Sequence, residues 1–205
     1  MNRSDAQLMR WAHEHLVYEA GMLTHAVEKV ADRQLSDQDH NAVMESFAIH
    51  VRCLRAFLWG KQRPDHPEDA FASDFCDPGL WETSRPPLPA ALKAIEGKRQ
   101  RVGREIVHLT YHRLDIKAET KDWDLTGLLH AIAEGLHEFA KVAKPERLHP
   151  KSRETLALTP KDYRVLVTAD DDESSPGLVA VSIPVAGGTI AFDGFTAGSI
   201  NLEVD

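Results

Sequence analysis

The chain has 205 residues, enough for one domain with an appendage or for two small units. Hydrophobic residues make up 42% and charged residues 27%, which is a globular composition, and two cysteines are too few for a disulfide framework. The net charge of -8 is unevenly distributed, because residues 170–205 contain seven acidic and no basic residues. The total charge therefore does not exclude a basic surface elsewhere in the chain.

No apolar run approaches the ~20 residues that a membrane-spanning helix needs. The N-terminus leads into a polar helix and not into the apolar core of a signal peptide. The sequence thus predicts a cytoplasmic protein without a membrane anchor.

Two long amphipathic helices are expected at the start of the chain. The first covers 4–31, where Ser4 and Gln7 have the spacing of a capping box, and the second covers 37–60 and ends at Gly60. In both, apolar residues recur at helical spacing and form one face. These faces consist of Leu8, Trp11, Ala12, Leu16, Met22, Leu23, Ala26 and Val30, and of Val43, Phe47, Val51, Leu54 and Leu58.

Residues 61–87 form a connection in which five prolines forbid a continuous helix. Its large apolar residues predict that it packs across the helices and is not a free linker. They are Phe71, Phe75, Leu80 and Trp81.

A third helix is expected over 88–116 and a fourth over 124–143. Four amphipathic helices with these connections predict a mainly α fold, an antiparallel four-helix bundle over residues 1–148. Residues 149–205 are expected to form a short, acidic, β-rich extension. Alternating apolar residues predict strands near 163–167, 179–185 and 200–204, with a hairpin turn at Gly187-Gly188.

The polar side of the third helix carries the main functional candidates. On a helical wheel of ~100° per residue, Arg101, Arg104, His108 and His112 lie opposite the apolar face. Residues 93–113 have a local charge of +4, from six basic and two acidic residues, which attracts phosphates. A solvated helix face is the simpler interpretation of such a charge pattern.

Arg101 and His108 are seven residues apart, so they point in the same direction from a helix. An imidazole can donate or accept a proton near neutral pH. A guanidinium stays charged and can hold a phosphate through two hydrogen bonds. This pair suits metal-free cleavage of an RNA backbone, in which the 2′-hydroxyl attacks phosphorus and negative charge builds up there.

The segment Arg101-Val-Gly-Arg-Glu-Ile-Val-His108 resembles the Arg-x(4–6)-His signature of HEPN-domain proteins, and His108-Leu-Thr-Tyr-His-Arg113 is similar to bacterial members related to abortive-infection proteins. By helix order the resemblance covers roughly residues 5–143. It implies a homodimer whose paired motifs form a metal-independent endoribonuclease without a cofactor. Such proteins often serve as toxins or antiviral effectors, which implies a cognate antitoxin or regulatory protein as a partner.

Carried over to this chain, the resemblance makes Arg101 the group that stabilises the phosphate and His108 the general acid and base. Tyr111 and His112, one turn beyond, could contact a nucleotide by stacking or hydrogen bonds, and Arg104 is a further substrate-binding candidate. Many active members have a polar residue directly after the arginine, whereas this chain has Val102. A non-catalytic member that binds a nucleotide or a partner is therefore a second hypothesis.

A third hypothesis is a metal-dependent enzyme, because His15, Glu19 and His50 lie within the apolar faces of the first two helices. Buried polar groups need partners, so these three could meet between the helices and bind a metal ion. A hydrogen-bonded core pair is the simpler interpretation. Glu134 and His137 form a Glu-x-x-His motif, but they are expected on the solvent side of the fourth helix, as is His130.

Overall fold

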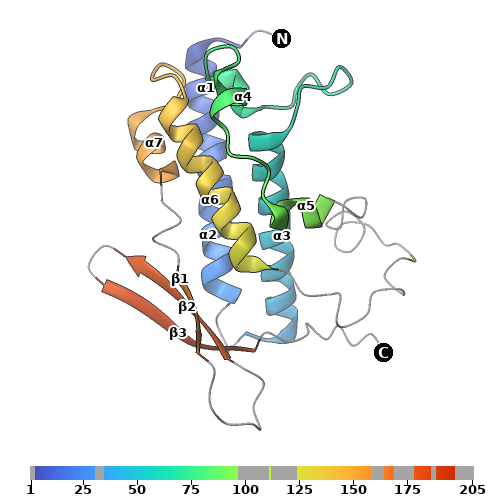
Figure 1. The fold of residues 1–205 in the computed structure, drawn as a ribbon, viewed down its shortest axis with the longest axis vertical. Coiled ribbons are helices and arrows are strands. Elements are labelled where there is room, and N and C mark those ends of the chain that lie inside the picture. The colour runs from blue at the N-terminus through green and yellow to red at the C-terminus, as the bar shows by residue number, and fades with distance from the viewer. Residues whose placement is uncertain are drawn as a thin grey trace.

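The computed structural model describes residues 3–30, 35–96, 111 and 124–157, and the backbone of three strands between 164 and 196. The described chain is mainly helical, with α2, α3 and α6 running side by side (Figure 1). Among the described residues, no helix is both long and apolar enough to cross a membrane.

The first helical rod consists of α1 (Asp5–Trp11), the π-helical turn η1 (Ala12–Leu16) and α2 (Val17–Val30). Its start is confirmed as a capping box, because the Gln7 amide donates to Ser4 Oγ at 3.3 Å and the Ser4 amide donates to the Gln7 side chain at 2.9 Å. The π turn was not predicted. It widens the helix locally and so changes the direction of the side chains around it.

The second rod, α3 (Asp37–Trp59), begins and ends as predicted. Ser36 Oγ accepts a hydrogen bond from the Asp39 amide at 3.2 Å, and the helix ends at Gly60. A Cβ atom at Gly60 would lie 2.6 Å from the Phe71 ring, so only glycine lets the connection approach here. Phe47, Val51, Leu54 and Leu58 are all buried, as the apolar spacing predicts.

The connection after α3 contains a 3-10 turn, η2 (Ala72–Phe75), and a short helix, α4 (Leu80–Ser84). As predicted, it packs against the helices: Phe71, Phe75 and Trp81 are buried. Leu80 departs from the prediction that this apolar residue packs against the helices. It is the first residue of α4 and is 37% exposed, and its neighbour Trp81 is buried in the core instead. The Trp81 indole donates to the Leu58 carbonyl at 2.7 Å.

Two further helices complete the core. α5 (Ala90–Glu96) is the described part of the predicted third helix, and Leu92 and Ile95 on it are buried. α6 (Leu125–Val142) confirms the predicted fourth helix and begins at Asp124, whose carboxylate accepts from the Gly127 amide at 2.8 Å. Phe139 of α6 meets Phe57, Phe75 and Trp81 edge to face, with ring centres 5.1 to 6.0 Å apart.

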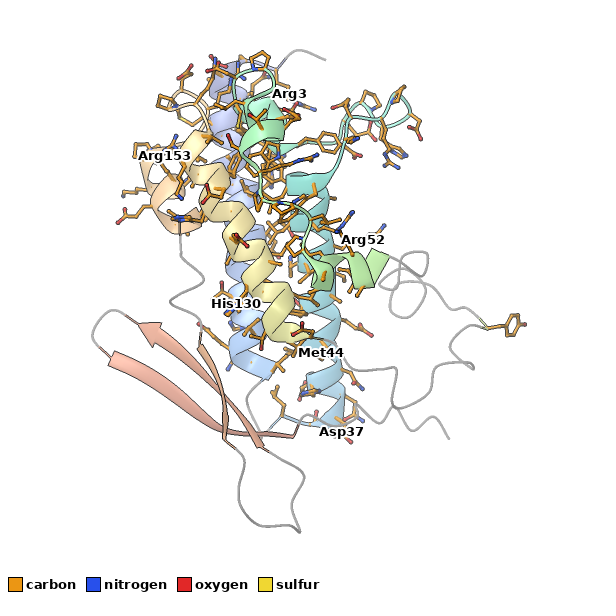
Figure 2. All side chains as sticks on the ribbon, viewed as in Figure 1. Arg3, Asp37, Met44, Arg52, His130 and Arg153 are labelled. Carbon is orange, nitrogen blue, oxygen red and sulfur yellow. The ribbon has the colours of Figure 1, made fainter. Side chains whose placement is uncertain are left out.

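A last helix, α7 (Pro150–Leu156), lies in the segment expected to be β-rich. Leu156 is buried in the common core, so the helical part reaches at least to Ala157. Arg153 lies on α7 next to α6 (Figure 2), and its guanidinium donates to the carbonyl groups of Ala140 and Ala143, which end α6. The Ser152 hydroxyl is buried and hydrogen-bonds with the His13 ring at 3.0 Å.

The backbone beyond α7 contains β1 (Arg164–Thr168), β2 (Leu178–Val185) and β3 (Gly188–Thr196). They form an antiparallel sheet in the order β1-β2-β3, with Val167 opposite Val179 and Ile183 opposite Ile190. A register shift lies between Val179 and Val181. The segment 200–204, which we predicted as a strand, lies outside the described residues.

Candidate functional site

The main predicted site lies in the sequence between α5 and α6. Arg101, Arg104, His108 and His112 lie outside the described residues. Tyr111 is described, and its side chain is 90% exposed. The described structure therefore defines the helices that flank this segment, α5 before it and α6 after it.

Glu19 and His50 do meet between α2 and α3, as predicted. The His50 Nδ1–H donates to Glu19 Oε2 at 2.8 Å. His50 is 8% exposed within the apolar face of α3, and the carboxylate provides the partner that a buried imidazole needs. Tyr18 packs its ring edge to face against His50, with ring centres 6.0 Å apart.

The prediction that His15 joins this pair is wrong. His15 is exposed, and its ring lies against Trp11 with centres 5.9 Å apart. On a regular α-helix His15 and Glu19 would share one face, but His15 lies within the π turn η1, whose wider spacing breaks that relation. The expected metal-binding set of His15, Glu19 and His50 is therefore not formed.

Cys53 of α3 is a further polar residue close to this pair in the sequence. It follows His50 by three positions, and so lies on the same side of α3. Burial raises the pKa of the Cys53 thiol, the Glu19 carboxylate raises it further, and Arg52 lowers it. The thiol is thus protonated at neutral pH, which does not suit a nucleophile. The sequence signal that indicates Cys53 is its three-residue spacing from His50, which places both on one side of a helix.

The histidines of α6 are less exposed than predicted. Glu134 is exposed as expected, but His130 and His137 are half-buried. The reason at His137 is α7, because the His137 Nδ1–H donates to the Ala157 carbonyl at 3.2 Å. The His137 ring therefore helps to attach α7 to α6.

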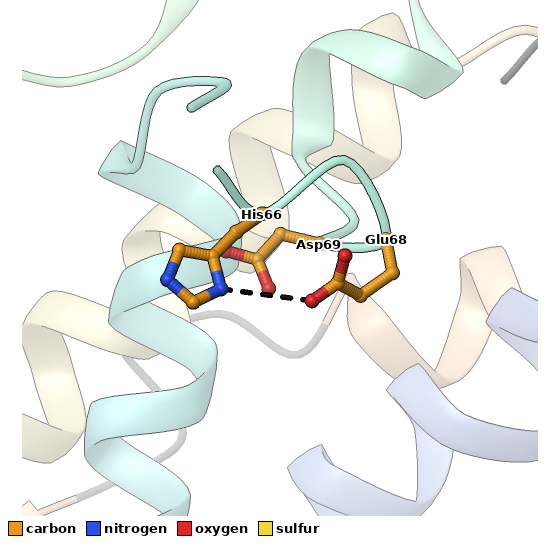
Figure 3. A group of neighbouring side chains, drawn as sticks. All are labelled: His66, Glu68 and Asp69. Atoms are coloured by element: carbon orange, nitrogen blue, oxygen red, sulfur yellow. Dashed lines mark ion pairs between the residues drawn. The ribbon is translucent and has the colours of Figure 1, made fainter. Parts of the chain in front are cut away.

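A second group of polar side chains, which the sequence pattern does not predict as a site, lies in the loop after α3. Figure 3 shows His66 beside Glu68 and Asp69, with His66 Nδ1 3.6 Å from Glu68 Oε1. Among the described residues, only this group has three potential metal-ligand atoms within 4.8 Å of one another. Arg63 already neutralises Asp69 through a 3.3 Å ion pair, and the loop is largely exposed, so these contacts are those of an ordinary polar loop.

A cleft of about 300 Å³ lies between α2, α6 and α7. Its lining is mostly apolar and includes Leu23, Ile132 and Leu136. The polar side chains that line it are Thr24, His25, Glu28 and Thr155.

No model of a protein family, no curated protein and no solved structure gives a significant match to this chain.

Proposed function

We propose that this protein is a HEPN-like endoribonuclease that cuts RNA without a metal ion, as a toxin or phage-defence effector. The observation that carries the proposal is the spacing of Arg101 and His108 within a basic, amphipathic segment. An arginine and a histidine two helical turns apart present a phosphate-binding group and a proton-transfer group on one face of a helix.

The described helices support the proposal by their order. Two long antiparallel helices, α2 and α3, are followed by a packed connection and then by α5 and α6. Leu92 and Ile95 of α5 are buried in the common core, on the side that the apolar spacing of the third helix predicts. In the proposed fold this helix continues to 116 and completes a four-helix bundle.

In the proposed site, Arg101 holds the scissile phosphate and stabilises the charge that develops on it. His108 removes the proton from the 2′-hydroxyl and returns a proton to the leaving 5′-oxygen. Arg104, Tyr111 and His112 bind the neighbouring nucleotides. A two-fold homodimer through the third helix brings two such pairs into one cleft.

In this proposal, the acidic β-rich extension is a binding partner of the basic segment of the third helix. Residues 170–205 are strongly acidic, whereas residues 93–113 are basic, so the two segments attract each other. The same basic stretch is the surface that an antitoxin or regulatory protein covers. A cytoplasmic location, where RNA substrates occur, is part of the proposal.

The test is an RNA cleavage assay with purified, untagged protein in excess EDTA. Wild type is expected to cut a mixed RNA substrate, and His108→Ala is expected to lose at least a hundredfold in rate, since general acid–base catalysis contributes about 10²–10⁴. His25→Ala is the matched control, because His25 is an exposed histidine on the described part of α2. Circular dichroism of all three proteins checks that they fold alike.

Wild type that leaves RNA intact removes the catalytic proposal. If such protein still binds RNA, and Arg101→Ala weakens that binding, the non-catalytic alternative is favoured. Equal cleavage by wild type and His108→Ala contradicts the assignment of the site.

A further inference from the structure

The loop after α3 holds its side chains on a backbone that is fixed at several points. The sequence Arg63-Pro-Asp-His-Pro-Glu-Asp69 contains two prolines, and each of them locks one backbone angle. The His66 amide donates to the Arg63 carbonyl at 3.1 Å, and the Asp69 amide donates to the His66 carbonyl at 3.3 Å. The loop therefore presents its polar side chains in a defined arrangement, although it is neither a helix nor a strand.

The side chains of His66, Glu68 and Asp69 converge on one place (Figure 3). One possible ligand atom from each lies within 4.8 Å of the other two, so a point exists that is no farther from any of them than 4.8 Å divided by √3, about 2.8 Å. Zn²⁺ binds nitrogen and carboxylate oxygen at about 2.0–2.2 Å. Each ligand atom therefore needs to move by about 0.8 Å at most to reach an ion at that point.

Taken one at a time, these contacts are ordinary, but the two ring nitrogens of His66 face two different carboxylates. Nδ1 is 3.6 Å from Glu68 Oε1, and two ligands of one tetrahedral Zn²⁺ ion are about 3.3–3.6 Å apart. Nε2 is 3.4 Å from Asp65 Oδ2. A carboxylate at the far nitrogen of a metal-binding histidine fixes its tautomer and orients its ring. His66 thus has a ligand position on one side and an orienting carboxylate on the other.

We propose that His66 Nδ1, Glu68 and Asp69 bind one Zn²⁺ ion. Asp65 orients the imidazole without touching the ion, and water takes the fourth position. An imidazole among the ligands favours Zn²⁺ over Mg²⁺ and Ca²⁺, which prefer oxygen. The proposal is independent of the RNA-cleaving function, which uses no metal ion.

Arg63 is compatible with this site. Its guanidinium is 3.3 Å from Asp69 Oδ2, and the carboxylate has a second oxygen for the ion. Carboxylates that bind a metal are commonly hydrogen-bonded by an outer group in this way. Residues 63–69 contain three acidic residues and one basic residue, so their net charge of -2 attracts a dication.

The experiment is a Zn²⁺ titration of reduced, untagged, full-length protein by isothermal titration calorimetry. Wild type is expected to bind one Zn²⁺ ion per chain in this loop. His66→Ala and Glu68→Gln are expected to bind it at least tenfold more weakly, and Asp65→Asn about tenfold, because loss of an outer partner typically costs 10–100-fold in metal affinity. His25→Ala is the matched control, since His25 is an exposed histidine on α2 with Glu28 three residues later, and it is expected to bind as wild type.

Nitrogen NMR of the histidine rings, on protein loaded with Zn²⁺, gives a second readout. Nδ1 of His66 is expected to be the bound nitrogen, while Nε2 keeps its proton and faces Asp65. Circular dichroism checks that the variants of this exposed loop fold as wild type does. The proposal is overturned if wild type binds no Zn²⁺, if His66→Ala binds it as tightly as wild type, or if Nε2 of His66 is the bound nitrogen.

Discussion

Gly135 of α6 packs closely against the side chains of Leu58 and Trp59 of α3, and replacing it tests that packing. A Cβ atom at Gly135 would lie 2.6 Å from the Trp59 ring and 2.8 Å from Leu58 Cδ1. Real Cβ atoms essentially never come that close, so one of these side chains must move. Leu58 is fully buried, and the Trp59 indole is held by a 3.0 Å hydrogen bond to the Pro86 carbonyl.

Two opposing effects decide the result of Gly135→Ala. Alanine in a helix interior is better than glycine by about 1 kcal/mol. Overpacking of a rigid core costs about 1–3 kcal/mol, and the two short contacts favour the upper part of that range. We therefore expect a net loss of about 1–2 kcal/mol in the free energy of unfolding.

Gly21 provides the matched control, because it also lies inside a helix, α2, and a Cβ atom there would meet nothing within 4 Å. Gly21→Ala has only the helical gain, and is expected to stabilise the protein by about 0.5–1 kcal/mol. Urea unfolding of both variants is followed by circular dichroism at 222 nm, a signal that reports on all the helices together and not on one site. If Gly135→Ala proves as stable as Gly21→Ala, the described packing of α6 on α3 is wrong.

Three further predictions concern the core and the thiols. Trp81→Phe removes the buried hydrogen bond to the Leu58 carbonyl, and is expected to lower the free energy of unfolding by about 1–3 kcal/mol in urea titrations; an unchanged midpoint would contradict it. Arg153→Met keeps the aliphatic stem but removes the donors to the end of α6, so thermal unfolding should show a lower Tm, whereas an equal Tm would mean that the contacts are not made. In thiol-labelling kinetics of native protein, Cys53 should react alone, and faster as the pH rises, because its raised pKa leaves little thiolate at neutral pH. Burial raises the pKa of Cys76 to about 11, so Cys76 should react only after unfolding, and two fast native thiols would refute this.

The long helices could be predicted because their signals are local. Ser4 and Ser36 start the first two rods, Gly60 ends the second, and Asp124 starts α6. Each of these positions depends on hydrogen bonds to residues within one turn, which the sequence alone displays.

The short elements could not be predicted in the same way. α7 has only seven residues and one buried leucine, Leu156, so it shows no helical period. Its position depends on contacts with distant residues, such as the bond between Ser152 and His13 and those of Arg153 to the end of α6. Such tertiary contacts override weak local preferences.

The candidate site at the α2–α3 seam was half predicted. His50 and Glu19 were identifiable as polar residues within apolar faces, and they do pair. His15 was expected beside them because a regular wheel was assumed, and the π turn η1, which has no compositional signal, breaks that assumption.

The most direct test of the central claim is the chemistry of the RNA ends that the protein produces in EDTA. Attack by the 2′-hydroxyl, with His108 moving the protons, leaves 2′,3′-cyclic phosphate and 5′-hydroxyl ends. We predict these ends with wild type and none with His108→Ala. Products with 5′-phosphate ends, or cleavage that needs an added divalent ion, would contradict the account.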